Sequence, residues 1–355
     1  MGSVDPRGQV KSQGKADRES AGVDRFDTGD GRRVYRLPLE VFPHFWGNAY
    51  LVTGGERPLL VDCGSGTGTS RRDLEAGLAT VAERFDESVA WNDLGAVVLT
   101  HGHIDHFGGL KHLRAQTDAP IGIHVLDRRV VDGYRVRVAV ASRHLELFFR
   151  SAGVEGERLA RYMASYRQTK ALFDDPGEHA LIDWVFDEGP IHDGVEAIHV
   201  PGHCPGMVCL RLGDVLLTAD QVLPRITPHL SPESITRHMG LAHYLASLDR
   251  IEALEGVRLG LGGHGGPIDD VSGRCRAIRR HCLERTERVL ELCTTPRSIL
   301  ELSRELFGRV RSYHVLLAIL ETGTYVEYLD QRGALRADNV DALEAGDSTI
   351  LYRST

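Results

Sequence analysis

Residues 100–109 read THGHIDHFGG and place four side chains that can bind metal ions within six positions. The apolar segment before them has the pattern of a buried strand, and the pattern after them is helical. In an extended segment alternate side chains share a side, so His101 and His103 can reach one ion together. Where the chain turns into the helix, Asp105 and His106 can face a second ion. The stretch therefore predicts a metal site at the end of a buried strand.

Three further candidate ligands lie downstream, and each follows an apolar strand pattern. They are His203 after residues 197–200, Asp220 after residues 215–217, and His264 after residues 257–261. The alternative interpretation of residues 100–109 is a surface loop that happens to be rich in histidine. The repeated strand-end setting of the downstream residues disfavours it.

The donor set consists of imidazoles and carboxylates, which suit Zn²⁺, although iron and manganese use the same donors. Seven ligands are too many for one tetrahedral ion but suit two ions if one carboxylate bridges them, and Asp220 is the predicted bridge. The predicted first site is completed by His101, His103 and His203, and the second by Asp105, His106 and His264. Paired ions supply an activated water with a pKa of about 7, so no Ser or Cys nucleophile is needed.

Two further residues adjoin the predicted ligands or resemble them in setting, and the sequence supports a role for them less strongly. Cys204 adjoins His203, but adjacent side chains on an extended turn point apart, so we predict a buried thiol and not a ligand. Asp62 ends a strand pattern before the glycine-rich segment 64–68, where a turn or a helix cap is the plain interpretation. Its functional interpretation is a carboxylate that orients metal ligands by hydrogen bonds. The glycines are not a phosphate loop, because the Gly-Lys-Ser/Thr ending is missing.

The composition bounds the class of protein. A chain of 355 residues with 42% hydrophobic and 26% charged residues is ordinary for a globular protein with one large and one small domain. The formal charge of −8 disfavours a nucleic-acid-binding role. The six cysteines form no CxxC pair, which favours free thiols in a reducing cytoplasm. With no apolar segment of membrane-spanning length and no signal-peptide pattern, we expect a cytoplasmic protein without a membrane partner.

The order Asp62, His-X-His-X-Asp-His, His203, Asp220, His264 resembles the metallo-β-lactamase superfamily across roughly residues 30–270. The resemblance implies an α/β fold, a four-layer αβ/βα sandwich of two sheets with helices outside and a dinuclear site at the sheet edge. Within the superfamily, the His-X-His-X-Asp-His form with a bridging Asp220 looks like the glyoxalase II and lactonase side. The residues after Asp220 and the C-terminal appendage resemble thioesterase-like and lactamase-β-like hydrolases.

The domain organisation follows from changes in pattern. Residues 1–25 are polar and nearly free of large apolar groups, so we expect a flexible tail. We expect residues 26–270 to form the catalytic domain, with a helical insertion at about 126–175. Residues 271–355 would form a small winged-helix-like domain, a module that this branch of the superfamily often carries.

The helical insertion has two open interpretations, a substrate lid and a packing or dimerisation element, so a homodimer is one expectation. Five arginines crowd its first half and are usually a solvated face, although they could meet an anionic substrate such as a phosphate-bearing thiol carrier. They are Arg128, Arg129, Arg135, Arg137 and Arg143.

In the C-terminal segment, Thr295 is the predicted N-cap of a helix, with Pro296 at its first position. From Gly273 onward there are thirteen Arg, no Lys and twelve Asp plus Glu, a net charge of about +1 that is too small for a DNA-tracking face. We therefore expect this segment to pack on the catalytic domain or on a partner subunit.

The leading functional hypothesis is a dinuclear zinc hydrolase that cleaves a thioester or an ester/lactone through a metal-bridging hydroxide. The substrate would be a small acyl compound such as a CoA or glutathione thioester. The predicted catalytic residues are Asp105, Asp220 and His264, and the candidate substrate contacts are Tyr166, His229 and His238. The alternatives are an endoribonuclease, which needs a basic track, and an iron-dependent oxidoreductase on the same scaffold. A non-enzymatic binding module would leave the ligand set unexplained.

Overall fold

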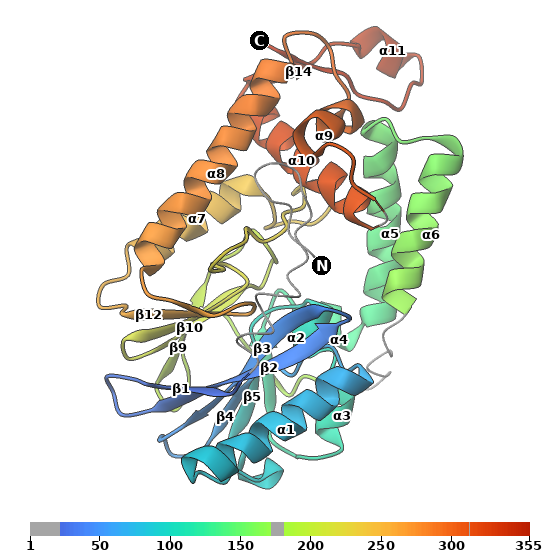
Figure 1. The fold of residues 1–355 in the computed structure, drawn as a ribbon. Helices are drawn as coiled ribbons and strands as arrows, with labels where there is room; N and C mark the ends of the chain where they lie inside the picture. The colour runs from blue at the N-terminus through green and yellow to red at the C-terminus, as the bar shows by residue number, and fades with distance from the viewer. Residues whose placement is uncertain (1–21, 172–180, 312) are drawn as a thin grey trace.

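The computed structural model describes residues 22–171, 181–311 and 313–355. Within them, two β-sheets face each other (Figure 1). The first sheet has the strand order β1 (Asp24–Asp27), β2 (Arg33–Phe42), β3 (Phe45–Thr53), β4 (Leu59–Val61), β5 (Ala96–Leu99), β6 (Ile121–His124) and β7 (Trp184–Phe186). The second has the order β13 (Pro267–Ile268), β12 (Leu259–Gly262), β11 (Val215–Ala219), β10 (Val208–Leu212), β9 (Val195–His199) and β8 (Gly189–His192).

The first sheet begins as an antiparallel meander and continues with parallel pairs. Strands β1 to β4 pair antiparallel, whereas β4, β5, β6 and β7 pair parallel. Parallel pairing requires a crossover, which the helices between these strands provide. Strand β1 corrects the predicted tail: residues 1–21 lie outside the described residues, but Asp24 and Arg25 already pair with β2.

The core between the sheets explains why the central strands are apolar throughout. Val61 and Val98 of the first sheet share a buried cluster with Leu210, Leu217 and Leu261 of the second. The opposite face of the first sheet packs under helices, so β4 and β5 are covered on both sides and all their residues are buried.

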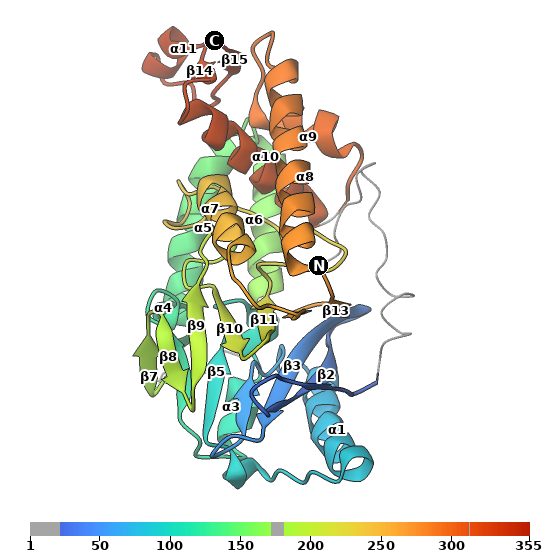
Figure 2. The same cartoon turned by 90° about the vertical axis from the view of Figure 1, so that its left-hand side faces the viewer.

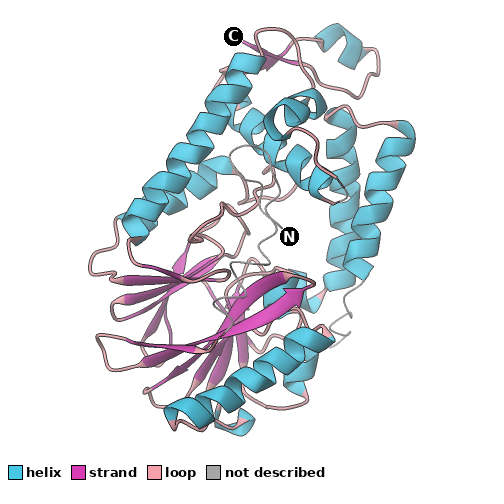
Figure 3. Cartoon of the chain, in the orientation of Figure 1, coloured by secondary structure: helices cyan, strands magenta, loops and turns pink. Residues whose placement is uncertain are grey.

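Helices cover the outer faces of both sheets (Figure 3). Helices α1 (Gly68–Phe85) and α3 (Leu110–Arg114) lie on the first sheet, and α7 (Leu241–Glu252) and α8 (Val271–Leu292) lie on the side of the second (Figure 1). The short α2 (Ile104–Phe107) begins directly after His103 and carries Asp105 and His106. The predicted four-layer α/β arrangement is therefore confirmed.

The predicted insertion is helical. It contains α4 (Arg128–Asp132), α5 (Tyr134–Ser151) and α6 (Gly156–Ala171), while residues 172–175 lie outside the described part. Figure 2 shows α5 and α6 rising from the sheets toward the C-terminal helices. The contact is close, because a Cβ added to Gly323 of the C-terminal segment would overlap the Phe148 ring of α5.

The C-terminal segment continues from α8 with α9 (Ile299–Phe307), α10 (His314–Asp330), β14 (Leu335–Ala337), α11 (Val340–Glu344) and β15 (Tyr352–Ser354). Strands β14 and β15 pair antiparallel. The predicted cap is wrong: α9 starts at Ile299 and is capped by Ser298, whose Oγ accepts from Glu301 N, and not by Thr295. Ser298 and Glu301 form a capping box, a stronger N-terminal signal than the upstream Thr-Pro pair.

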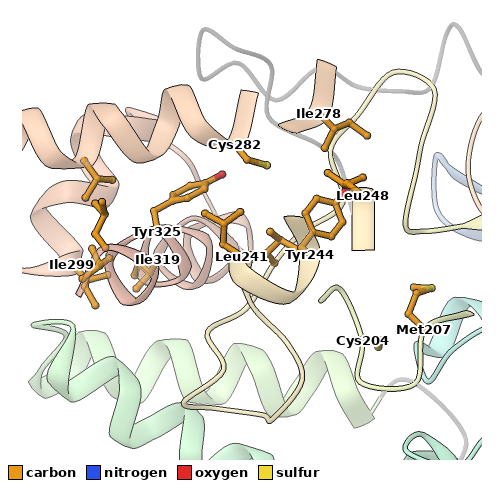
Figure 4. Packing of buried hydrophobic residues seen from close by; sticks show 14 of the residues in the cluster. Cys204, Met207, Leu241, Tyr244, Leu248, Ile278, Cys282, Ile299, Ile319 and Tyr325 are labelled. Atoms are coloured by element: carbon orange, nitrogen blue, oxygen red, sulfur yellow. The ribbon is translucent and has the colours of Figure 1, made fainter. Parts of the chain in front are cut away.

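This segment shares a hydrophobic core with the catalytic layers. Figure 4 shows Tyr244 and Leu248 of α7 facing Ile278 of α8, and Tyr325 of α10 beside Cys282. One buried cluster thus joins the outer layer of the second sheet to α8, α9 and α10, and it also includes residues of α5 and α6. The C-terminal segment packs on the catalytic domain, as expected from its charge. Among the described helices, none is both long and apolar enough to cross a membrane.

Candidate metal centre

The predicted metal ligands come together where strands of both sheets end. The first four follow β5 or lie on α2, and the others follow β9, β11 and β12. The former are His101, His103, Asp105 and His106, and the latter are His203, Asp220 and His264. Loops that follow neighbouring strands meet at one edge of a sheet, so residues far apart in the sequence become neighbours in space.

Two groups of histidine and aspartate donors are each compact enough to hold one ion, with all donor atoms within 4.8 Å of one another. They are His101, His203 and Asp220, and Asp105, His106 and His264; a third group of the same compactness consists of His101, His103 and Cys204. Asp220 lies between the first two groups. Its Oδ2 is 3.8 Å from His203 Nε2 and 3.3 Å from His264 Nε2. Its Oδ1 is 3.6 Å from His106 Nε2, so this carboxylate faces both groups.

Asp105 and His103 complete the arrangement. Asp105 Oδ2 lies 3.5 Å from His264 Nε2, within the second group. His103 Nδ1 lies 3.1 Å from His101 Nε2, so these two nitrogens face the same point on the side of the first group. The structure thus brings His101, His203 and Asp220 together and Asp105, His106 and His264 together, with His103 beside His101.

Several polar atoms in this cluster are buried without a hydrogen-bond partner. They are His106 Nε2, His203 Nε2 and Asp220 Oδ1, on side chains that are buried from solvent. Each such atom costs about 1–3 kcal/mol if it stays unpaired. A cation between the rings and the carboxylate would remove that cost, and imidazole nitrogens and carboxylate oxygens are suitable donors. The residues therefore fit a pair of divalent metal ions.

The Nδ1 atoms of three of the rings are held from outside the cluster. The Nδ1 of His106 lies 2.7 Å from Asp62 Oδ2. The Nδ1 atoms of His203 and His264 each lie 2.7 Å from a backbone carbonyl oxygen, of His229 and Trp46 respectively. Such contacts orient each ring and direct its Nε2 toward the metal position.

Asp62 occupies the place that its functional interpretation requires. Its Oδ1 accepts a hydrogen bond from Thr100 N at 2.8 Å, and its Oδ2 accepts one from Thr100 Oγ1 at 2.8 Å. Thr100 Oγ1 in turn lies 3.0 Å from His101 Nδ1. Through these contacts and the one to His106, Asp62 connects β4 to ligands of both groups.

The pKa values divide the cluster into two halves. Burial, assisted by neighbouring imidazoles, lowers the pKa of His101 and His103 well below the usual range, which keeps these rings in the neutral form that binds metals. Burial acts in the same direction on His264, but the carboxylates of Asp220 and Asp105 outweigh it and raise the pKa of His264 to about 9. In this half a bound cation would take the place of the ring proton as the partner of the carboxylates.

Asp127 is a residue that the sequence analysis missed. It follows β6, is fully buried, and ties two ligand-bearing loops together: Oδ2 accepts from Gly102 N at 2.8 Å and Oδ1 from Gly206 N at 2.9 Å. Burial raises the pKa of Asp127 to about 6, against the effect of these two hydrogen bonds. The available signal was an acidic residue just after a buried strand, the same setting as Asp62.

Cys204 lies closer to the centre than predicted. The thiol is buried, as predicted, and its Sγ is within 4.8 Å of the donor nitrogens of His101 and His103, which the sequence analysis did not foresee. The turn that carries it packs back against the loop of residues 101–103, which local geometry does not reveal. Burial raises the pKa of the Cys204 thiol well above its usual range, which favours the protonated form over the thiolate that metals bind. All six cysteines are free and buried, as predicted.

A pocket of about 280 Å³ opens on the centre and reaches the helices above it. His103, Asp105, His203, Asp220 and His264 line one side of it. The predicted substrate contacts Tyr166 and His229 also line it, together with Lys170 of α6, which the sequence analysis missed. His238 is not among the described residues of the wall; its ring lies 5.8 Å from that of His243, so the structure does not support it as a substrate contact.

The predicted arginine cluster does not line the pocket either. None of the five arginines of the insertion is among the described lining residues, and Arg128 forms an ion pair with Asp132 on its own helix. The expectation that they meet an anionic substrate is therefore not supported at this pocket.

Comparisons with known proteins agree with the geometry. Residues 45–264 match the model of the metallo-beta-lactamase superfamily. The probable metallo-hydrolase YqjP of Bacillus subtilis is 25% identical over 300 residues, covering 81% of this chain and 88% of that protein. An atrochrysone carboxyl ACP thioesterase of Aspergillus fumigatus is 26% identical over 228 residues, 63% of this chain and 52% of that protein. A metallo-beta-lactamase family protein of Thermus thermophilus superposes with a TM-score of 0.71 at 26% identity, over 91% of this chain and 98% of that one.

Proposed function

Because the chain belongs to the metallo-beta-lactamase superfamily, we propose that it is a dinuclear metal-dependent hydrolase of thioesters or esters, lactones included. Zinc is the proposed native metal. The proposal takes the substrate to be a small acyl compound, such as a CoA or glutathione thioester, whose acyl part enters the pocket.

The observation that carries this proposal is the position of Asp220. Its Oδ2 faces His203 of the first group and His264 of the second, its Oδ1 faces His106, and the same residue lines the pocket. A carboxylate in such a place can bridge two ions, which a single structural metal site would not need. The pocket wall beside it includes apolar side chains such as Leu145, Ile226 and Met239, which suit an acyl chain.

The reaction is the addition of water across the acyl bond. The water oxygen forms a bond to the carbonyl carbon, the carbon–sulfur or carbon–oxygen bond breaks, and the products are a carboxylic acid and a thiol or alcohol. When bound, the two metal ions supply Lewis acidity and lower the pKa of water. Asp220 and Asp105 each lie close to His264 Nε2, and with this ring they would hold metal beside the pocket. The apolar walls exclude bulk water, which strengthens these polar interactions.

A thioester is the favoured substrate class for a chemical reason. A thiol has a pKa of about 8.5, so the leaving group departs as a thiolate and needs no proton donor. Among the described residues of the pocket, no carboxylic acid with a raised pKa stands ready to protonate an alkoxide. The similarity to a thioesterase of Aspergillus fumigatus supports the same choice.

The test combines metal analysis with a substrate panel. Metal content is measured on protein loaded separately with zinc, iron and manganese, and each form is assayed on acyl-CoA, acyl-glutathione, lactone, β-lactam and single-stranded RNA substrates. We expect two zinc ions per chain and turnover of a thioester or ester. Asp220→Asn should lose turnover and bound metal while remaining folded, whereas Asp118→Asn, a change at an exposed carboxylate, should retain both. Undiminished hydrolysis by Asp220→Asn would contradict the proposed mechanism. Cleavage of RNA and of no other substrate would show an endoribonuclease in place of the proposed thioester or ester hydrolase.

A further inference from the structure

The pocket has a second polar region, away from the metal ligands, on the wall formed by α8 and α10. Apolar side chains of α5, α9 and α10 also line the pocket, among them Leu145, Phe307 and Leu317. The polar region consists of His281, Arg285, His314 and Glu321, with the ring of His229 beside it. Figure 1 shows α8 and α10 above the sheets that carry the metal ligands. The pocket thus has a metal-binding side and a second polar region on α8 and α10, with His229 between them.

Arg285 is the unusual member of this region. The residue is only 8% exposed, and among the described residues no carboxylate oxygen lies within 4.0 Å of its guanidinium. Its polar contacts are long: Nε is 3.3 Å from His281 Nε2, and Nη1 is 3.5 Å from the Leu306 carbonyl oxygen. A buried guanidinium without a direct counter-ion is costly, and buried charges in proteins are normally paired. A pocket-lining position makes a ligand the natural partner.

The surroundings of Arg285 favour a planar anion. The guanidinium carbon lies 4.4 Å from the centre of the Phe307 ring, so the ring covers one face and leaves the nitrogen-bearing edge for hydrogen bonds. Two other wall nitrogens are buried without a hydrogen-bond partner, His314 Nε2 and His229 Nδ1. A group with two acceptor oxygens could satisfy more than one of these donors, and carboxylate is the usual bidentate partner of arginine.

Glu321 limits the charge that the region can accept. Its carboxylate accepts a hydrogen bond from Tyr325 Oη at 2.8 Å and lies 3.9 Å from His229 Nδ1. Because this negative charge sits on the same wall as Arg285, a dianionic phosphate would be repelled more strongly than a singly charged carboxylate. The volume of about 280 Å³ holds an acyl chain of moderate length but not the nucleotide of a CoA, which would remain outside.

We propose that Arg285 is a specificity-determining residue that binds a carboxylate at the far end of the acyl chain. The preferred substrates are then half-thioesters or half-esters of dicarboxylic acids, with the reacting carbonyl at the metal centre and the free carboxylate at Arg285. This inference rests on the proposed function for the identity of the reacting bond, but not for the existence of the carboxylate site.

The experiment compares matched substrates on the full-length, metal-loaded enzyme. Succinyl-, glutaryl- and adipyl-CoA are assayed beside butyryl-, valeryl- and hexanoyl-CoA, and the ratio of kcat/KM within each pair measures recognition of the carboxylate. We expect the ratio to exceed one for at least one pair, and Arg285→Gln to lower it roughly 10- to 100-fold through loss of a charged hydrogen bond. Arg288→Gln removes an exposed guanidinium one turn along α8 and should leave the ratio unchanged. Arg285→Lys keeps the positive charge but lacks the planar, two-pronged donor geometry of the guanidinium, so it should give an intermediate ratio. This second variant keeps the test decisive if Arg285→Gln fails to fold.

A binding measurement separates the two proposals. Calorimetric titration with glutarate and with valerate should show a preference for glutarate in the wild type that Arg285→Gln abolishes, whether or not any thioester is hydrolysed. Hydrolysis without any preference for the dicarboxylic substrate would overturn the inference and leave the proposed function standing. A preference that depends on Lys170 and not on Arg285, or a preference for amino-acyl chains that is lost in Glu321→Gln, would also overturn it.

Discussion

Replacing Asp127 with Asn tests whether this carboxylate holds the metal-binding loops together. The carboxylate accepts hydrogen bonds from Gly102 N and Gly206 N, whereas an amide offers one oxygen and one NH₂ group. One buried N–H therefore loses its acceptor, at a cost of about 1–3 kcal/mol. The carboxylate has a cost of its own: burial raises the pKa of Asp127 from 3.8 to about 6, so the charged form at pH 7 destabilises the fold by about 3 kcal/mol. Because the pKa of Asp127 is higher in the folded protein than in the unfolded chain, the free energy of unfolding decreases as the pH rises from 3.8 to 6.

The two effects nearly offset each other, so Asp127→Asn should change the free energy of unfolding at pH 7 by less than about 2 kcal/mol. The loops, however, would no longer be held at both points, and we expect metal affinity to fall by roughly 10- to 100-fold, as for other residues that orient ligands. Competition with a chromophoric chelator measures the affinity, and urea unfolding of the metal-free protein measures the stability. The exposed Asp118→Asn serves as the control. A folded Asp127→Asn protein with wild-type metal affinity would refute the reasoning.

Three further changes probe the site and the fold. In Gly263→Ala the new Cβ would overlap Asp220 Oδ1, so metal analysis should find fewer than two ions per chain in a folded protein, and full occupancy would contradict the geometry. Hydrogen bonds from Arg33 lower the pKa of Glu87 to about 2. The Glu87 carboxylate therefore stabilises the folded protein fully above pH 4.5, and this stabilisation disappears as the pH falls toward 2. Glu87→Gln should therefore cost roughly 2–3 kcal/mol at pH 7 and almost nothing near pH 2 in metal-free protein, and a loss independent of pH would argue against the ion pair. Ser298→Ala should destabilise the protein by about 0.5–2 kcal/mol in thermal unfolding, because the cap of α9 is lost. An unchanged unfolding midpoint would contradict the Ser298 cap and favour a helix start at the upstream Thr-Pro pair.

The strands and the ligands at their ends could be predicted because both are recorded in local patterns. Val98 and Leu217 belong to short apolar segments that only a doubly covered strand explains, and His101 and Asp220 follow such segments directly. The start of α9 was misplaced because two local signals competed, and the capping box at Ser298 proved stronger than the Thr-Pro pair.

Other features depend on contacts between distant segments, which no local pattern contains. The loop after β6 brings Asp127 against backbone N–H groups of two separate loops, and the turn that carries Cys204 packs against the first histidines. The pocket is a product of the same packing, because its walls come from the sheet edge, the helical insertion and the C-terminal helices. Arg285 could therefore be placed in the pocket only from the tertiary structure.

The sequence by itself determined the set of donors and the strands that they follow, because strand periodicity and strand-end residues are properties of short segments. The arrangement in two sheets and four layers was expected from the resemblance to the metallo-β-lactamase superfamily. Only the tertiary structure decided which segments enclose the pocket and which side chains line its wall beyond the predicted ligands. Those choices depend on how α5, α6, α8 and α10 pack over the sheet edge, and that packing is set by apolar surfaces that are distant in sequence and meet only when the chain is folded.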